Sequence, residues 1–319
     1  MKEISVFDIP GFQIGHASDL ENGTGCTAIL APAGATAGVD VRGGGPATRE
    51  TDLLRPENMV QQIHAVVLSG GSAFGLESSA GVMQYLAEKG IGFAMKDITV
   101  PIVCEACLFD LGIGNPKAFP DKAMGYAAAK ASETRDESMG NVGAGTGASV
   151  GKLLGIDTSM KSGLGTYALQ AGNLMVGAIV GVNACGDVYE PNSSIPVAGL
   201  YDRHTRQHLD SETTLMGLYE SMCGQNTTIA CILTNAKLTK AEANKVAAMA
   251  QDALARTIRP VHTSNDGDTV FAMATGEVEA ATDLVGVMAV KALEQAIVRG
   301  CKAAEPAYGL PSWSSLQKQ

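Results

Sequence analysis

Short apolar runs alternate along this chain with longer helical patterns, and this alternation limits the possible folds more than any other feature. The runs are bounded by Gly, Pro or Asn, which is typical of strands. Strands are expected over residues 26–31, 63–68, 176–184, 227–234 and 271–275. Helices are expected over residues 73–89, 123–133, 239–256 and 280–299, with Thr239 and Glu242 forming a capping box at the third of them. The pattern predicts a layered α/β protein.

Glycine is frequent, with 38 residues among 319, but three glycine-rich segments fail the patterns of nucleotide-binding loops. A Walker loop ending at Gly151-Lys152 needs a glycine where Thr146 stands and a Ser or Thr where Leu153 stands. Residues 70–75 have neither Rossmann spacing nor a Gly-x-Ser-x-Gly elbow, and residues 143–147 lack a clean preceding strand. We therefore expect no organic cofactor, and we expect residues 140–151 to form a closely packed loop.

The net charge and the apolar segments of the chain indicate which binding partners and which cellular location to expect. A formal charge of -10 without a dense run of Lys or Arg argues against nucleic acid as a partner. The apolar stretch 174–184 is too short and too rich in glycine to span a membrane. The first ten residues lack the pattern of an export signal, and an odd number of cysteines, seven, suits reduced thiols. These features predict a cytoplasmic protein with no membrane partner.

Two further groups of residues could have either a functional or a purely structural role. Cys104 and Cys107 have the spacing of half a zinc site or a redox pair, but no second pair lies at zinc-ligand spacing, so buried thiols are the preferred interpretation. His262 stands near an acidic cluster and has the chemistry of a general base, but a lone loop histidine is more often structural. We expect no metal site.

The segment with the most specific chemistry follows residues 191–223, which are polar, lack a strong period and predict a long exposed connection. An exposed connection is where a chain can be cut without dismantling its core. It leads to Gly224-Gln225-Asn226-Thr227, where a hydroxyl is expected at the first position of a strand. Taken alone, Asn-Thr-Thr before a strand is usually a turn.

A strained backbone at this position would allow a different outcome. The Thr227 hydroxyl can attack the Asn226 carbonyl and convert the amide to an ester that water hydrolyses. The freed α-amino group of Thr227 has a reference pKa of about 7.7 to 8, so it can take the proton of its own hydroxyl. The pair would then be the N-terminal threonine variant of a nucleophile and its base.

An acidic cluster is the second candidate for the same site. Asp266 and Asp268 flank Gly267 and could orient an amine and a hydroxyl, and stabilise the ammonium form during turnover. Asp-Gly is also turn chemistry, and a hard-cation site is the other alternative, although no EF-hand spacing follows.

Taken in order, the motifs of this chain resemble the self-processing aminopeptidases, a family that includes L-aminopeptidase/D-esterase, β-peptidyl aminopeptidases and nylon-oligomer hydrolases. The matching segments cover nearly the whole chain. They are 8–11, 14–17, 24–27, 41–46, 68–75, 141–152, 182–184, Asn226-Thr227 and 266–268. The Asn-Thr and Asp-Gly-Asp combination is closer to the nylon-hydrolase branch.

The resemblance implies a role for several residues. Thr227 is implied to be the nucleophile and Asn226 the last residue of the upstream fragment, so that the chain is cut into residues 1–226 and 227–319. Asp266 and Asp268 are implied to align the nucleophile. Asn183 is implied to donate to the oxyanion with support from Lys152. Phe109 stands where several members carry a tyrosine, so one donor is missing here.

The resemblance also implies a fold and an activity. The fold is a four-layer αββα sandwich similar to that of N-terminal nucleophile hydrolases and ornithine acetyltransferases, formed as a single domain over residues 1–319 and commonly assembled into tetramers. The leading function is removal of N-terminal residues from short peptides, amino-acid amides or esters. Acyl transfer through the same threonine ester, and a non-catalytic binding protein that is never cut, are the alternatives.

Overall fold

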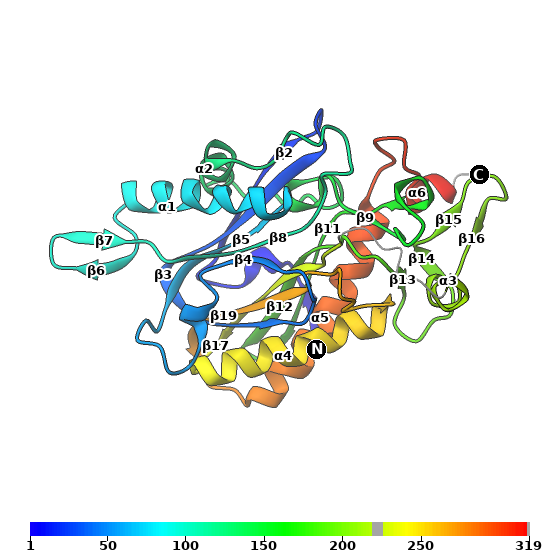
Figure 1. Cartoon of the computed structure of the whole chain (residues 1–319). Coiled ribbons are helices and arrows are strands. Elements are labelled where there is room, and N and C mark those ends of the chain that lie inside the picture. The colour runs from blue at the N-terminus through cyan, green and yellow to red at the C-terminus, as the bar shows by residue number, and fades with distance from the viewer. Residues whose placement is uncertain (219–225, 318–319) are drawn as a thin grey trace.

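The structure is a computed structural model that describes residues 1–218 and 226–317. One long strand, β3 (Thr24–Val41), belongs to both halves of its main sheet (Figure 1). The first part of β3 pairs with β2 (Gln13–Asp19) and β5 (Ile63–Ser69). Its last six residues pair with β19 (Thr269–Val278). β3 therefore passes from one sheet layer into the other and ties them together.

The first layer has the strand order β1-β11-β12-β17-β19-β3, and its added strands are β1 (Lys2–Ile4), β11 (Leu164–Ala171), β12 (Leu174–Gly181) and β17 (Ile229–Ala236). The second layer has the order β2-β3-β5-β8-β4, with β8 (Val103–Cys107) and β4 (Ala47–Arg49). Only two neighbouring pairs in the described main sheet are parallel, β17 with β19 and β5 with β8. Parallel neighbours need a crossover, and the α-helices α4 and α1 provide these two.

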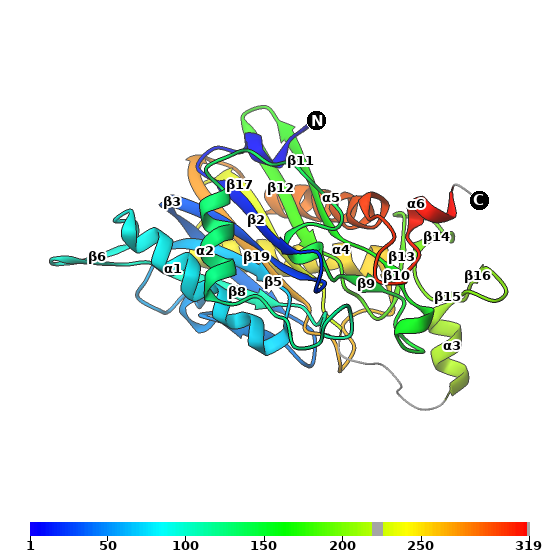
Figure 2. The same ribbon diagram turned by 90° about the horizontal axis from the view of Figure 1, so that it is seen from above.

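Helices cover the outer face of each layer (Figures 1 and 2). α4 (Lys240–Thr257) and α5 (Thr282–Ala303) pack on the first layer, and α1 (Ser78–Glu88) and α2 (Lys122–Ala131) pack on the second. Fully buried Phe271, Ile29 and Leu68 lie between the two sheets, within the middle of three apolar cores. The predicted four-layer αββα arrangement is confirmed.

The remaining elements are short. They are the strands β6 (Phe93–Met95), β7 (Ile98–Val100), β9 (Ser149–Val150), β10 (Met160–Lys161), β13 (Asp187–Tyr189), β14 (Pro196–Ala198), β15 (Tyr201–Asp202), β16 (Gln207–His208) and β18 (Ile258–Arg259), the helices α3 (Ser211–Leu218) and α6 (Trp313–Leu316), and the 3₁₀ turns η1 (Val6–Asp8), η2 (Asp52–Leu54), η3 (Ser72–Glu77), η4 (Gly143–Gly145) and η5 (Ile156–Thr158). In the described part of the chain, no helix combines the length and apolarity that crossing a membrane requires.

Every predicted strand and helix is present, with shifted ends. The predicted helix 73–89 opens as the 3₁₀ turn η3 and becomes α-helical only at Ser78. The capping box of α4 is confirmed, because the Thr239 hydroxyl accepts the Glu242 amide and the Glu242 carboxylate accepts the Thr239 amide. Residues 140–151 form the predicted loop, interrupted only by η4 and β9.

The long exposed connection predicted for residues 191–223 is confirmed only in part over the described residues 196–218: residues 203–207 are exposed, but residues 197–201 are buried and the segment contains β14, β15, β16 and α3. β14 pairs with β13, and Leu200 is buried. The buried carboxylate of Asp187 accepts the amides of Leu200 at 2.6 Å and of Ser211 at 2.8 Å. This side-chain anchor orders a segment whose own sequence lacks a periodic pattern. Residues 219–223 of the predicted connection, and Gly224 and Gln225 after it, lie outside the described residues.

Candidate active site

Thr227 lies just before β17 and is almost completely buried, with 4% of its surface exposed. The predicted position at the head of the strand is wrong by two residues. The amide of Thr227 donates to the carbonyl oxygen of Asn183 at 3.0 Å, and the amide of Thr228 donates to Oδ1 of Asp268 at 2.7 Å. Because these two amides donate to groups outside the β-sheet, β17 begins only at Ile229. Thr227 is therefore held just before the first residue of the strand.

The Thr227 hydroxyl lies against the peptide bond on its own upstream side. Oγ1 of Thr227 is in hydrogen-bond contact with the carbonyl oxygen of Asn226. The amide of Gly267 lies 3.1 Å from that same carbonyl oxygen and 3.1 Å from Oγ1. The Thr227 hydroxyl and the Asn226 carbonyl group are therefore held together by one backbone N–H group.

A side chain at position 267 would disturb this arrangement. A Cβ atom there would lie 2.8 Å from Oγ1 of Thr227 and 2.9 Å from the carbonyl oxygen of Gly45, closer than side-chain carbons normally approach other atoms. Glycine at position 267 therefore leaves room for the Thr227 hydroxyl.

The two aspartates have different environments. The Asp268 carboxylate is fully engaged, because Oδ1 accepts the Thr228 amide and Oδ2 accepts the His262 amide at 3.2 Å and contacts His262 Nδ1 at 2.8 Å. In Asp266, Oδ2 accepts the Thr263 amide at 2.8 Å, and Oδ1 is buried without a hydrogen bond in the described part of the chain. Asp268 therefore holds the backbone of Thr228 and His262, whereas one carboxylate oxygen of Asp266 has no hydrogen bond among the described residues.

Burial is the main cause that raises the pKa of Asp266, to about 6, and the neighbouring Asp268 charge raises it further. A carboxyl with a pKa near working pH suits an acid or base better than one in its ordinary range. His262, which the sequence left unassigned, is brought into the site as the partner of Asp268.

Asn183 and Lys152 form another part of the site. Nζ of Lys152 donates to Oδ1 of Asn183 at 2.7 Å and to its carbonyl oxygen at 3.0 Å. Oδ1 also accepts the Ser149 amide at 3.1 Å, and Nδ2 donates to the carbonyl oxygen of Phe109 at 2.9 Å. These contacts fix the orientation of the Asn183 amide. Burial lowers the pKa of Lys152 to about 7.

A glycine-rich loop at residues 43–45 packs against the turn that carries Asp266 and Asp268. The amide of Gly45 donates to the carbonyl oxygen of Asp266 at 2.8 Å, and that of Gly44 donates to the Thr263 carbonyl at 3.2 Å. A Cβ atom at Gly43 would lie 2.1 Å from the Asp266 carbonyl oxygen and one at Gly44 would lie 2.5 Å from that of Ser264, so these two positions require residues without side chains. The run of glycines was the only signal of this role in the sequence.

Lys161 supports the loop that carries Ser149, and no sequence signal pointed to it. Its side chain is completely buried, and Nζ donates to the carbonyl oxygens of Gly145 at 2.9 Å and Ala148 at 3.0 Å, as well as to Ser162. Burial lowers the pKa of Lys161 to about 7. The glycine-rich loop 140–151 is thus fixed beside the site by a cation that its carbonyls surround.

The segment 70–75, compared above with nucleotide loops, is bound to a buried carboxylate. Oδ1 of Asp110 accepts the amide of Gly71 at 2.7 Å, and Oδ2 accepts the hydroxyl of Thr24 at 2.8 Å. Cys104 and Cys107 are buried free thiols, as predicted. No cluster of three or more His, Cys, Asp or Glu side chains suited to a metal ion occurs among the described residues.

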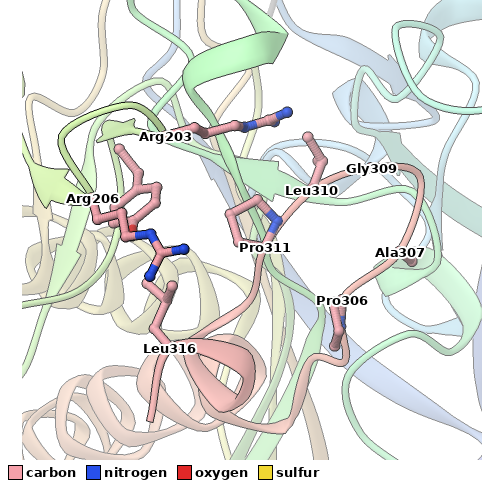
Figure 3. Close-up of a pocket in the computed structure, with 9 residues that line it drawn as sticks. Arg203, Arg206, Pro306, Ala307, Gly309, Leu310, Pro311 and Leu316 are labelled. Atoms are coloured by element: carbon pink, nitrogen blue, oxygen red, sulfur yellow. The ribbon is translucent and has the colours of Figure 1, made fainter. Parts of the chain in front are cut away.

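A cavity of about 120 Å³ adjoins the site. It is lined by Phe109, Gly112, Ile113, Ser149, Lys152, Gly155, Ile156 and Asn226. A larger cavity of about 470 Å³ lies elsewhere, where Arg203 and Arg206 face the loop of Pro306 and Pro311 (Figure 3). None of the site residues lines that larger cavity. Of these two cavities, only the smaller one is lined by residues of the site, Lys152 and Asn226.

Comparisons with known proteins show what the whole chain is similar to. The model of peptidase family S58 matches residues 5–312. An uncharacterized aminopeptidase of Mycobacterium leprae (strain TN) is 38% identical, with 98% of this chain and 94% of that protein covered. A 6-aminohexanoate-oligomer endohydrolase of Paenarthrobacter ureafaciens is 33% identical, with 88% of this chain and 78% of that protein covered.

A solved structure shares the fold. The L-aminopeptidase D-Ala-esterase/amidase of Ochrobactrum anthropi matches with a TM-score of 0.72 at 19% identity, over 96% of this chain and 88% of its own. It is described as a new variant among N-terminal nucleophile hydrolase folds. At this identity the likeness concerns the arrangement of sheets and helices alone.

Proposed function

This chain belongs to peptidase family S58, and we propose that it is an N-terminal nucleophile hydrolase that activates itself by cutting its own Asn226–Thr227 bond. The family match and the named relatives make it a hydrolase of the aminopeptidase and amidohydrolase type. The resemblance predicted from the motifs is thereby confirmed. The cut, the nucleophile and the roles of individual residues are our proposal.

One observation carries the proposal: the Thr227 hydroxyl and the Asn226 carbonyl share a single donor in a buried site. Attack of Oγ1 on the carbonyl carbon, with loss of the hydroxyl proton to Asp266, leads to an ester and a free Thr227 amine. Water then hydrolyses the ester. The products are residues 1–226 and 227–319, which stay together as one folded domain because β17 remains paired with β12, and β19 with β3.

The cut would leave the new amine in place to serve as the base. Its nitrogen lies 3.0 Å from the carbonyl oxygen of Asn183, which accepts its hydrogen bond before the cut and can do so afterwards. The amine takes the proton of the Thr227 hydroxyl as that oxygen attacks a substrate carbonyl. Nδ2 of Asn183 then donates to the substrate oxyanion, while Lys152 holds the amide in place.

We propose short peptides, amino-acid amides or esters as substrates. The adjoining cavity has apolar side chains from Phe109, Ile113 and Ile156, so it suits an uncharged acyl group. The phenyl ring of Phe109 supplies no hydroxyl donor, and its backbone carbonyl accepts Asn183 Nδ2 instead. The test is an amide-release assay with a competing amine present. Free acid as the main product identifies a hydrolase, whereas transfer to the amine identifies an acyltransferase.

Self-cleavage should depend on pH through Asp266. Below the raised pKa of about 6 the carboxyl is protonated and cannot accept the hydroxyl proton. The cleavage rate should therefore fall about tenfold for each pH unit below 6 and level off above it. Newly synthesised uncut chain, shifted from low pH to a series of higher values and followed on denaturing gels, gives this profile. A midpoint at the ordinary carboxyl value would contradict the assignment of Asp266.

We also propose that the cut chains assemble into a tetramer of αβ units. The hairpin of β6 and β7 extends from the body of the molecule (Figure 1) and exposes Met95 and Ile98, at 53% and 61%. Exposed apolar groups of this kind are frequent where copies of a protein meet. Light scattering of the purified protein tests the predicted mass.

A further inference from the structure

The structure places two different hydrogen-bond donors near the reacting threonine, and we propose that each serves a different reaction. The backbone amide of Gly267 stabilises the oxyanion of self-cleavage, whereas the Asn183 side chain serves the oxyanion of substrate turnover. This inference rests on the proposed function, because it assigns a donor to each of its two reactions.

The argument starts from the position of the Gly267 amide. It lies 3.1 Å from the Asn226 carbonyl oxygen, the atom on which negative charge develops when Oγ1 attacks. A donor aimed at that oxygen before the reaction starts needs no reorganisation during it. The same N–H lies 3.1 Å from Oγ1, so it stays close to the oxygen of the ester that forms.

The Gly267 amide is held in place on both sides. The Asp266 carbonyl accepts the Gly45 amide at 2.8 Å, and the Gly267 carbonyl accepts the Thr269 hydroxyl at 2.8 Å. The turn is joined to the threonine segment as well, because the Thr269 amide donates to the Thr228 carbonyl at 3.2 Å. Donor and scissile bond therefore belong to one hydrogen-bonded unit.

Asn183 is directed elsewhere in the uncut chain. Ser149 and Lys152 hold its Oδ1, and this turns Nδ2 toward the Phe109 carbonyl. Phe109 and Lys152 line the 120 Å³ cavity beside the site. The Asn183 side chain is completely buried and is held by residues that line the space a substrate would enter, while its backbone carbonyl accepts the Thr227 amide.

The bonds of the cleavage step can be followed through this unit. The Oγ1–carbon bond forms, the hydroxyl proton passes to Asp266, and the carbonyl electrons move to the oxygen that Gly267 donates to. The carbon–nitrogen bond then breaks and the nitrogen takes the proton, which leaves an ester. Water adds to the ester carbonyl, the carbon–oxygen bond breaks, and the products are the Asn226 carboxyl group and a free Thr227 hydroxyl.

Two substitutions at position 267 isolate the N–H group. Gly267→Ala and Gly267→Pro both add a Cβ atom near Thr227, but only proline removes the donor. The glycine is not in the left-handed region, so neither residue is excluded by that conformation. We expect newly synthesised Gly267→Pro chain to be cut about 10² to 10³ times more slowly than Gly267→Ala chain, the usual effect of losing one oxyanion donor.

A third variant tests whether the Asn183 side chain serves substrate turnover and not self-cleavage. It also tests the inference if both glycine variants fail to fold. We expect Asn183→Ala to be cut within about threefold of the wild-type rate and then to turn over an amino-acid amide about 10² to 10³ times more slowly. Equal cleavage of the alanine and proline variants at 267, or parallel loss of cleavage and turnover in Asn183→Ala, overturns the inference. The proposed function survives that result if wild-type chain is cut, whereas an active wild-type chain that stays whole overturns both.

Discussion

Thr227→Ala should give a folded chain that is never cut and has no amide-hydrolysing activity. The substitution removes the attacking oxygen of both reactions, and loss of a nucleophile costs hydrolases of this kind about 10⁴-fold or more in rate. Folding should survive, because the hydroxyl contributes a hydrogen bond with the Gly267 amide worth about 1 kcal/mol. Denaturing gels, a thermal melt and an amide-release assay measure the three outcomes.

The neighbouring threonine provides a matched control. Thr228 is also buried, and its hydroxyl has no hydrogen bond within the described residues. Thr228→Val has nearly the same shape and keeps the backbone amide that donates to Asp268. This variant should be cut and active like the wild type. Activity in Thr227→Ala, or loss of cutting in Thr228→Val alone, would show that the wrong hydroxyl has been assigned.

Asp266→Asn is expected to have the second largest effect. The amide keeps the shape of the carboxyl and can still accept the Thr263 amide, but it cannot take a proton from the Thr227 hydroxyl. General base catalysis contributes about 10²- to 10⁴-fold, so self-cleavage should slow by that factor. The residual rate should also lose its dependence on pH near 6, because that dependence belongs to the missing carboxyl.

Glu105→Gln is the control for removal of a buried acid. Glu105 is completely buried in β8, accepts the Ser78 hydroxyl at 2.6 Å, and has a pKa that burial raises to about 7. It contacts neither the threonine nor the aspartate turn among the hydrogen bonds of the described residues, so Glu105→Gln should be cut normally. A wild-type cleavage rate in Asp266→Asn would remove Asp266 from the mechanism.

The layers of the fold could be predicted because the periodicity of the sequence is strong where they form. The buried strands 63–68 and 176–184 and the capped helix beginning after Thr239 needed no tertiary information. The ends of the strands and helices were predicted less accurately, and the start of β17 shows why. Thr227 and Thr228 have β-branched side chains that favour a strand, but their amides are bound by Asn183 and Asp268, which are distant in the sequence.

The site was predicted only for residues that have a reactive side chain or belong to a motif. Thr227, Asp266 and Asp268 are brought together as expected, and Asn183 and Lys152 lie beside them. Gly267 could not be recognised as a donor, because a backbone amide looks the same at every position. Lys161 was missed because the carbonyls that surround its Nζ come from residues 145, 148 and 162, and a set of backbone acceptors leaves no sequence pattern.

The order in residues 196–218 was missed for a related physical reason. Asp187, in β13, binds Leu200 and Ser211 through buried hydrogen bonds. Asp187 is buried, with 1% of its surface exposed, and this burial raises its pKa to about 6. A lone aspartate in the sequence gives no sign that it will organise a segment well beyond it in the chain.

The intact mass of purified, active protein tests the central claim most directly. The account predicts two polypeptides whose masses add up to the full chain plus one water, with the smaller beginning Thr-Thr-Ile-Ala at residue 227. Fully active enzyme that consists of one unbroken polypeptide of 319 residues would contradict it.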